Sequence, residues 1–162
     1  MNKTDLTFRR TVKPEDIENV RNIVASTGFF YDFEIPVAVE LVQAAVEEGD
    51  ESGYFFIFAE VDGKTVAYSC YGQIACTDAG YDLYWIVTHN DYRGHGIGRI
   101  LLEETHKAVK GLGGRYIIAE TSGLPKYTPT RNFYLSNQYD EDAIIRDFYM
   151  PGDDKFIYVK RL

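Results

Sequence analysis

The sequence predicts an α/β fold in which helices flank one mixed sheet, and two observations carry that prediction. Three apolar segments, at 53–61, 64–72 and 81–88, are joined by short connections, as in an antiparallel meander. An amphipathic segment from Ile97 to Leu112 then leads to a fourth apolar segment at 115–121. Because a helical crossover joins parallel strands, the last two strands should run parallel. A chain of 162 residues is long enough for one core, so we expect a single domain over 1–162.

Before the meander, the sequence predicts one strand and two helices. Leu6 to Val12 alternates as a strand does, and Lys13 to Asp16 starts a helix with a proline in its first turn. Gly28 ends that helix, and a second runs from Pro36 to near Gly49. The first should bury Ile17, Val20, Ile23, Val24 and Thr27, and the second Val37, Leu41, Val42, Ala45 and Val46.

The helix at 97–112 has the clearest amphipathic pattern in the chain. Apolar residues recur at three- and four-residue spacing, while charged residues fall on the opposite face. The buried set is Ile97, Ile100, Leu101, Thr105, Ala108, Val109 and Leu112, and the solvent face carries Arg99, Glu103, Glu104, Lys107 and Lys110.

After the fourth strand of this series, the sequence predicts a short helix and a hairpin. Thr128 is expected to cap a helix that starts at Pro129 and ends near Asn137. Segments 142–150 and 155–161 then form two strands around the turn from Pro151 to Asp154.

Composition restricts the partners and the compartment. The net charge of −8 argues against a nucleic-acid partner and favours a cationic one. No apolar run approaches the roughly 20 residues of a membrane span, and the first residues lack the apolar region of a signal peptide, so we expect a cytoplasmic protein with no membrane partner. Cys70 and Cys76 are too far apart on an extended strand to pair, and they should be free thiols that fill the core.

The turn before the 97–112 helix carries glycines at 94, 96 and 98. Glycines leave backbone N–H groups uncovered, and the first turn of a helix has unpaired N–H groups at the positive end of its dipole. Such a turn binds phosphate. The dinucleotide fingerprint needs a glycine where Arg99 stands, and the lysine of a P-loop is absent, so both of those phosphate-binding motifs are disfavoured.

The pattern Arg93-x-x-Gly96-x-Gly98, preceded by a strand that ends in Val87-Thr88, resembles the Arg/Gln-x-x-Gly-x-Gly/Ala motif of the GNAT N-acetyltransferase superfamily. The predicted order β-α-α-β-β-β-α-β-α-β-β is also that of the GNAT fold, so the resemblance covers essentially the whole chain. It implies a mostly antiparallel sheet that splays between the fourth and fifth strands, with acetyl-CoA as the co-substrate.

The resemblance also assigns residues to acetyl-CoA. Backbone N–H groups from about Arg93 through Gly94, His95, Gly96, Ile97 and Gly98 to Arg99 would hold the pyrophosphate. Ile86, Val87 and Thr88 would line the pantetheine, with an N–H group near Val87 directed at the thioester oxygen. The splay of the sheet is expected where these residues separate from 119–122.

A tyrosine that protonates the leaving thiolate follows from the same resemblance. Thr130-Arg-Asn-Phe133-Tyr134 and Gln138-Tyr139 resemble the family pattern Ala-x-x-Phe-Tyr-x-x-x-Gly-Phe, with threonine and glutamine in place of alanine and glycine. Tyr134 is therefore the candidate acid and also a cofactor contact. The alternative is a core aromatic residue whose hydroxyl only caps a backbone group.

The base that takes the amine proton is less well determined by the sequence. Glu120, near the end of its strand, is the candidate, with Asp82 and Tyr84 as competitors. His89 is an alternative base, although an ordering role in the turn suits it better. His89, His95 and His106 do not form a metal set, so we expect no metal. No cysteine stands where it would form an acyl-enzyme, which favours direct attack by the amine.

The connection between the first two helices, from Phe29 to Ile35, is unusually aromatic and acidic. Phe29, Phe30, Tyr31 and Phe33 either form one wall of an acceptor pocket or plug the helix pair against the sheet. Both interpretations remain open at this stage.

The sequence thus predicts transfer of an acetyl group from acetyl-CoA to the primary amine of a small molecule or peptide. A non-catalytic acyl-CoA-binding or partner-binding domain of the same fold is the main alternative, and a longer acyl chain or a hydroxyl acceptor is another. The acceptor's identity and a homodimer both remain open: Phe148, Tyr149, Phe156 and Tyr158 would suit either a core or a dimer interface.

Overall fold

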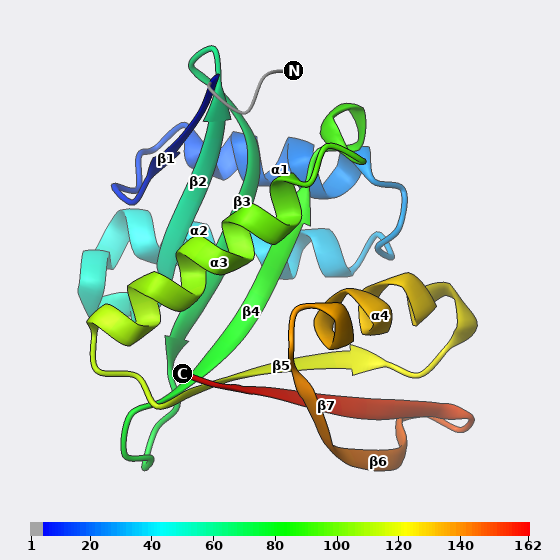
Figure 1. The fold of residues 1–162 in the computed structure, drawn as a ribbon. Coiled ribbons are helices and arrows are strands. Elements are labelled where there is room, and N and C mark those ends of the chain that lie inside the picture. Colours follow the sequence, from blue (N-terminus) through cyan, green and yellow to red (C-terminus); the bar gives the residue numbers. More distant parts are fainter. Residues whose placement is uncertain (1–4) are drawn as a thin grey trace. The chain divides into compact units, whose positions relative to one another are not determined.

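A computed structural model describes residues 5–162 (Figure 1). The chain divides into two compact units. Unit 1 comprises the described residues up to Gly72 together with Tyr84–Lys107, and unit 2 comprises Gln73–Leu83 and Ala108–Leu162. Within residues 5–162, no helix is both long enough and apolar enough to cross a lipid bilayer.

The predicted order of helices and strands is confirmed. The strands are β1 (Leu6–Arg9), β2 (Phe55–Val61), β3 (Lys64–Gln73), β4 (Gly80–Thr88), β5 (Tyr116–Ser122), β6 (Asp140–Met150) and β7 (Asp153–Arg161). The α-helices are α1 (Asp16–Ser26), α2 (Glu34–Glu48), α3 (Ile97–Gly111) and α4 (Thr128–Ser136), and the 3₁₀ turns are η2 (Gly49–Ser52), η3 (Asn90–Tyr92) and η4 (Pro125–Tyr127).

The strands form a seven-stranded mixed sheet in the order β1-β2-β3-β4-β5-β7-β6. β4 and β5 are parallel, as the crossover through α3 predicts, whereas β1 with β2, β2 with β3, β5 with β7 and β7 with β6 are antiparallel. The predicted class, an α/β fold with a mixed sheet flanked by helices, is therefore correct.

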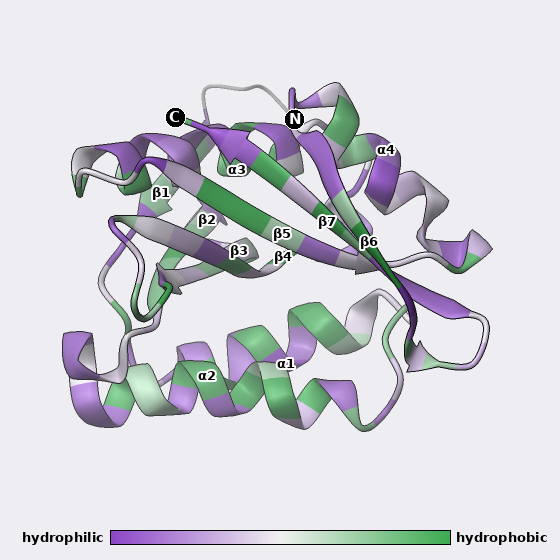
Figure 2. Ribbon diagram, turned by 90° about the horizontal axis from the view of Figure 1, so that it is seen from below, coloured by the Kyte–Doolittle hydropathy of each residue, from purple (hydrophilic) through white to green (hydrophobic). Residues whose placement is uncertain are grey.

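In unit 1, helices α1 and α2 lie side by side on one face of the strands, and α3 lies on the other (Figure 1). The hydropathy colouring shows hydrophobic and hydrophilic residues alternating along α1 and α2 (Figure 2). Their apolar residues pack on one side of β2 and β3, against Phe56, Phe58, Tyr68 and Cys70. On the other side, Ser69 and Thr105 share a buried hydrogen bond of 2.8 Å that joins β3 to α3. Unit 1 therefore has a dense apolar core with few polar groups inside it.

The second helix starts earlier than predicted. It begins at Glu34 rather than Pro36, because the Glu34 carboxylate accepts a hydrogen bond from the Tyr31 amide. Pro36 fits within the first turn, where the amide of a residue has no acceptor in the helix and a proline therefore removes no helical hydrogen bond. Val37 is 47% exposed, so its inward assignment is wrong. The buried residues are Ala38, Val39, Val42 and Ala45, while Leu41 is partly buried and packs against the core, and Val46 is partly buried.

A buried carboxylate at the start of α1 was not predicted. Asp16 is fully buried and accepts hydrogen bonds of 2.8 Å from both terminal nitrogens of Arg9, and a further bond from the Lys13 amide. Arg9 also bonds Glu60 on β2. A charge so enclosed is tolerated because every acceptor site is occupied, and the network fixes β1 against α1.

In unit 2, α4 lies on one face of β5 and β7 (Figure 1), where Tyr134 stacks on Tyr158 with ring centroids 5.8 Å apart. The predicted cap of α4 is wrong. Thr128 is the first helical residue, and its hydroxyl accepts from Arg131 instead of capping the helix. The 3₁₀ turn η4 runs directly into α4, so Tyr127 occupies the cap position.

Three further burial predictions need correction. Leu112 is 55% exposed because α3 ends at Gly111, and Leu102 is buried in its place, while Ile100 is only partly buried. Ile17 and Thr27 of the first helix are likewise only partly buried. Both cysteines are free thiols, as expected, but only Cys70 is in the core; Cys76 is exposed in the turn before β4.

Candidate functional site

The turn between β4 and α3 is held by hydrogen bonds of its own. Tyr92 and Arg93 donate their amides to His89 and Asn90, which closes the 3₁₀ turn η3. The His89 side chain accepts from the Asp91 amide at 3.2 Å, the ordering role preferred for it from the sequence. The Asn90 amide donates to Ser26 at the end of α1. These hydrogen bonds therefore fix the position of the backbone just before the glycine segment.

Gly94 and Gly96 adopt the left-handed backbone conformation, with φ of 80° and 77°. Both residues are exposed, and a Cβ atom built at either would meet no atom within 4 Å. Packing therefore does not require glycine here; the backbone conformation does, because L-residues rarely adopt it. The result is a stretch of uncovered backbone directly before a helix.

Helix α3 begins at Ile97, and its first bond runs from the Ile100 amide to the Gly96 carbonyl at 3.2 Å. The amides of Ile97, Gly98 and Arg99 precede that bond and so have no acceptor within the helix. Arg93, by contrast, already donates its amide to Asn90. The amides suited to an anion are therefore those from Gly94 to Arg99, and the positive end of the helix dipole adds to their attraction for phosphate.

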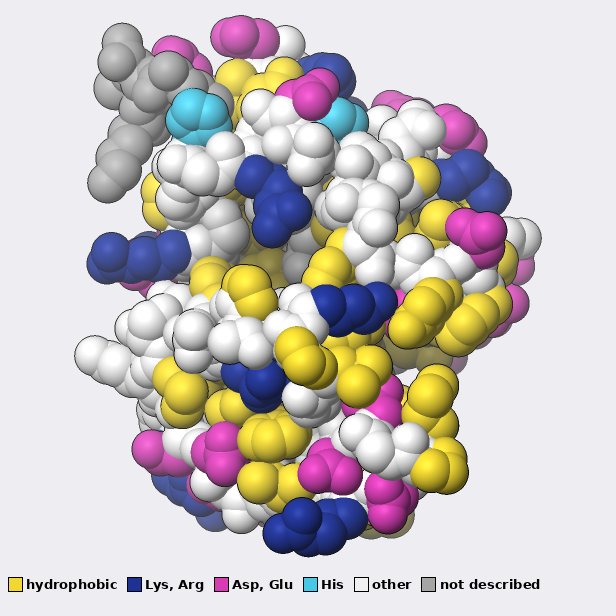
Figure 3. All heavy atoms as spheres, turned by 90° about the vertical axis from the view of Figure 1, so that its right-hand side faces the viewer, with side chains coloured by type: hydrophobic (Ala, Val, Ile, Leu, Met, Phe, Trp, Pro, Cys, Tyr) yellow, Lys and Arg dark blue, Asp and Glu magenta, His cyan; other side chains and the backbone are white. Residues whose placement is uncertain are grey.

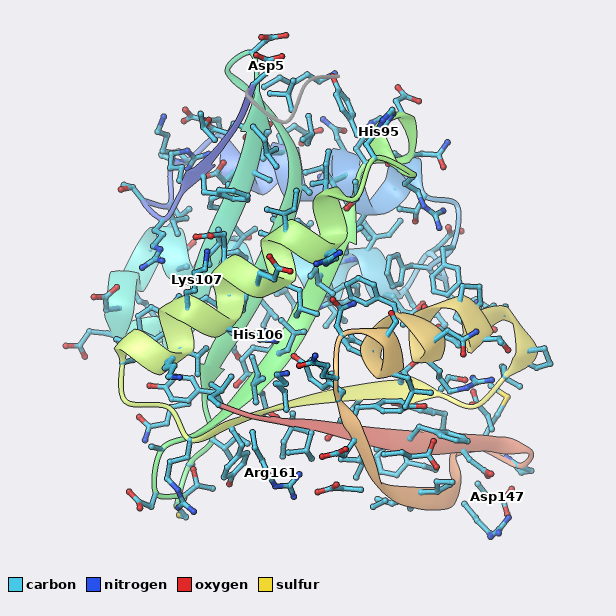
Figure 4. The ribbon with its side chains drawn as sticks, in the orientation of Figure 1. Asp5, His95, His106, Lys107, Asp147 and Arg161 are labelled. Atoms are coloured by element: carbon cyan, nitrogen blue, oxygen red, sulfur yellow. The ribbon has the colours of Figure 1, made fainter. Side chains whose placement is uncertain are left out.

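The three histidines do not converge. His95 lies in the turn at the start of α3, and His106 lies well along that helix beside Lys107 (Figure 4). Across residues 5–162, no group of three or more His, Cys, Asp or Glu side chains is arranged to hold a metal ion.

The end of β4 carries the residues predicted to line the pantetheine. Val87 is buried and packs with the apolar cluster of unit 1, whereas Ile86 and Thr88 are partly exposed. The register of β4 with β5 covers Gly80 to Leu83, although β4 continues to Thr88 and β5 to Ser122. The register pairs of these parallel strands therefore run as far as Leu83 and Ala119.

Tyr134 lies on α4 in unit 2 and is 6% exposed. Its ring contacts those of Phe133, Tyr139 and Tyr158, with centroid distances of 5.2 to 5.8 Å. Burial raises the pKa of its hydroxyl well above the usual value for tyrosine. The hydroxyl is protonated at neutral pH, as a general acid must be.

Glu120, the candidate base, is not free in this structure. Its carboxylate forms an ion pair with Lys155 of β7 at 2.5 Å, and its side chain is 44% exposed. The competing candidate Asp82 lies on β4 in register with Ile118. Burial, and then repulsion by Glu120, raise the pKa of the Asp82 carboxyl, while Lys155 opposes that shift. Lys155, which sequence reasoning missed, therefore connects both candidate bases.

The aromatic connection between α1 and α2 divides into two parts. Phe30 packs against the apolar cluster of unit 1 and contacts Trp85 at 5.0 Å, with Phe29 edge-on to it. Tyr31 and Phe33 stack on each other and are 44% and 72% exposed. The plug interpretation suits Phe29 and Phe30, and only Tyr31 and Phe33 are placed as an exposed pocket wall would be.

Comparison with known proteins identifies the family. A family model described as an acetyltransferase (GNAT) domain matches residues 52–141. A crystal structure from Desulfovibrio desulfuricans, assigned to the GNAT family of acetyltransferases, is 44% identical with a TM-score of 0.94, and the match covers 96% of this chain and 98% of that one. The chain belongs to the GNAT acetyltransferase family. No curated protein sequence matches it.

More distant structures share the fold of this GNAT protein. The ribosomal-protein-S18-alanine N-acetyltransferase of Escherichia coli is 18% identical with a TM-score of 0.74, over 96% of this chain and 93% of that one. PaiA N-acetyltransferase of Thermoplasma acidophilum, solved in complex with coenzyme A, is 19% identical with a TM-score of 0.72, over 97% and 99%. Similarity at this level of identity shows the fold alone, so it leaves the acceptor of this chain open.

Proposed function

We propose that this GNAT protein transfers the acetyl group of acetyl-CoA to a primary amine by direct attack. The observation that carries the proposal is the row of amides from Gly94 to Arg99, exposed by two left-handed glycines at the start of α3. Those amides fit the pyrophosphate of coenzyme A, because they present N–H groups and the positive end of a helix dipole without side chains in the way. Bound acetyl-CoA supplies an acetyl group activated as a thioester.

The residues of this chain would then serve the two proton transfers. As the new C–N bond forms and the C–S bond breaks, the departing sulfur gains a proton and the amine loses one. Tyr134, held protonated by its burial, is the proposed donor. Glu120 or Asp82 is the proposed acceptor, directly or through water. An amide near Val87 would stabilise charge on the carbonyl oxygen.

Calorimetry and a thiol-release assay test the proposal together. Acetyl-CoA should bind with measurable heat, and a panel of primary amines should release free coenzyme A thiol. Because Cys76 is exposed, its own reaction with the thiol reagent must be removed with a Cys76→Ser protein. Binding without release for any amine would instead support the alternative of a non-catalytic acyl-CoA-binding domain, and absence of binding would refute both.

Tyr134→Phe tests the proposed acid. The substitution should lower kcat by about 10²- to 10⁴-fold, the range of a general acid, while acetyl-CoA affinity changes little. Tyr139→Phe is the matched control, since it removes a buried phenolic hydroxyl from the adjoining ring, 5.2 Å away, and should keep kcat. Equal kcat values in the two variants would show that Tyr134 is only a packing residue.

A further inference from the structure

One face of the sheet in unit 2 carries three charged side chains from three different strands. Asp82 on β4 is in register with Ile118 on β5, and Glu120 lies two residues further on the same face of β5. Lys155 on β7 is in register with Ser122, which again places it on this face. These three residues are separated in sequence, so only the strand order brings them together.

The ammonium of Lys155 is held by more than an ion pair. It lies 2.5 Å from a Glu120 oxygen and 3.7 Å from the ring centroid of Phe148, with the Tyr149 ring at 5.9 Å. Only 12% of the Lys155 side chain is exposed. A carboxylate beside an aromatic face is the arrangement that proteins use to bind organic ammonium groups. Lys155 thus occupies a site with the chemistry of an ammonium receptor.

The two rings reach this position through an irregularity of β6. The register of β6 with β7 shifts between Ile145 and Met150, so the residues from Arg146 to Tyr149 bulge out of the ladder. Asp147 has φ of 52° at the centre of the bulge, where its amide donates to Asp154. A bulge re-aims the side chains next to it, and here it aims Phe148 at Lys155.

Charge is not balanced within this group. Two carboxylates, Asp82 and Glu120, face a single ammonium, and within residues 5–162 only Glu120 of the two forms an ion pair. One negative charge of the group is therefore not compensated by Lys155, and a second cation can compensate it. Exposed apolar side chains adjoin it on β6, among them Ile145, in register with Lys155, and Tyr149. Figure 3 shows one face of the molecule, on which hydrophobic side chains lie among Lys, Arg, Asp and Glu side chains.

We propose that Asp82, Glu120 and Phe148 bind the ammonium of the acceptor, and that Lys155 is the resident competitor that sets how tightly it binds. This inference rests on the proposed function, since the bound amine is the acetyl acceptor. The class of acceptor is a primary alkylammonium with an apolar group near the nitrogen. Lys155 then acts as a specificity-determining residue, because an acceptor must outcompete it for Glu120 and the Phe148 ring.

Lys155→Met removes the competing charge and keeps the length of the side chain. Phenethylammonium is a suitable probe, and its binding to the full chain in the presence of coenzyme A is measured by calorimetry. We expect the Kd to fall about tenfold, as when a cation of moderate affinity is removed from an ammonium site. Lys160→Met is the matched control on the same strand, where Lys160 bonds Gln138 instead, and it should leave the Kd unchanged.

A second pair of proteins separates competition from a general loss of positive charge. In a Glu120→Gln background, Lys155→Met should tighten binding much less, because the carboxylate for which Lys155 and the probe compete is gone and only the Phe148 ring is still shared. An unchanged or higher Kd in Lys155→Met, or the same fall in Lys160→Met, would overturn the inference. The probe binds without turnover, so this result stands apart from the thiol-release assay: a protein that releases coenzyme A but shows no Lys155 effect keeps its function and loses this site.

Discussion

The glycine turn before α3 and the charged face of unit 2 are built from different parts of the chain. The turn presents backbone amides from one continuous segment, Gly94 to Arg99, with no side chain needed for contact. The charged face combines side chains of β4, β5 and β7 with a bulge in β6. A site made of backbone amides depends on one short segment of sequence and recognises a group, such as phosphate, that many ligands share. A site made of side chains from distant strands can change its ligand when one of those side chains changes.

Between these two regions, the largest expected effect on binding comes from breaking the backbone site. Gly96→Ala places a Cβ on a residue with φ of 77°, which should cost about 1 kcal/mol of stability and shift the amides that follow. We expect acetyl-CoA affinity to fall about a hundredfold, measured by calorimetry. Acceptor binding to unit 2 should be untouched.

Gly113→Ala provides a control for the strain alone. Gly113 has φ of 84° just past the other end of α3, and a Cβ there also meets no atom within 4 Å. Its substitution should reduce stability as much as Gly96→Ala while acetyl-CoA affinity stays at the value of the unsubstituted chain. Equal losses of affinity in the two variants would mean that backbone strain, and not the position of the amides, determines binding.

The connection between α1 and α2 contains both a ring packed on the core, Phe30, and an exposed candidate for acceptor binding, Phe33. Phe30→Ala removes a ring packed on the core of unit 1 and should lower the free energy of unfolding by about 2 kcal/mol. Phe33→Ala should change stability by less than about 0.5 kcal/mol, since the ring is 72% exposed, yet raise the amine KM about fivefold if it forms the pocket wall. Thermal unfolding and steady-state kinetics measure the two effects. An unchanged KM in Phe33→Ala would show that the connection forms no pocket wall and only plugs the helix pair against the sheet.

The same contrast explains what could be predicted from the sequence. The order of helices and strands along the chain, the helix that begins at Ile97 and the glycine turn before it follow from local periodicity and from glycines at fixed spacing, and the structure has each of them. The start of α2 was missed because a carboxylate, Glu34, starts the helix two residues before the proline that marks the first turn.

The partner of Glu120 could not be predicted from local sequence patterns. Its partner Lys155 is 35 positions away (155 minus 120) and reaches it only because β7 inserts between β5 and β6. The bulge that supplies Phe148 lies within the β6–β7 hairpin, where the Asp154 carboxylate accepts from the Asp147 amide, and no periodicity or turn motif in the sequence indicated it. Sequence patterns specify which residues form a strand, but strand order decides which side chains meet across the sheet.

The smallest expected effect tests the charged face through the pH dependence of stability. The pKa of the Asp82 carboxyl is raised in the folded chain, chiefly by burial and then by Glu120, with Lys155 acting against them. A carboxyl whose folded pKa is raised stabilises the fold while it is protonated, and that contribution is lost as pH rises through the folded pKa. Asp82→Asn should therefore match the stability of the unsubstituted chain below about pH 4, the usual range of an unfolded aspartate, and become more stable than that chain above it. The difference should be less than about 1 kcal/mol because the site is half-buried.

Chemical unfolding at pH 3.5 and pH 7 measures this difference. A variant that is less stable than the unsubstituted chain at pH 7 would mean that attraction to Lys155 outweighs the burial of Asp82, and the charged face would then already be balanced without a second cation.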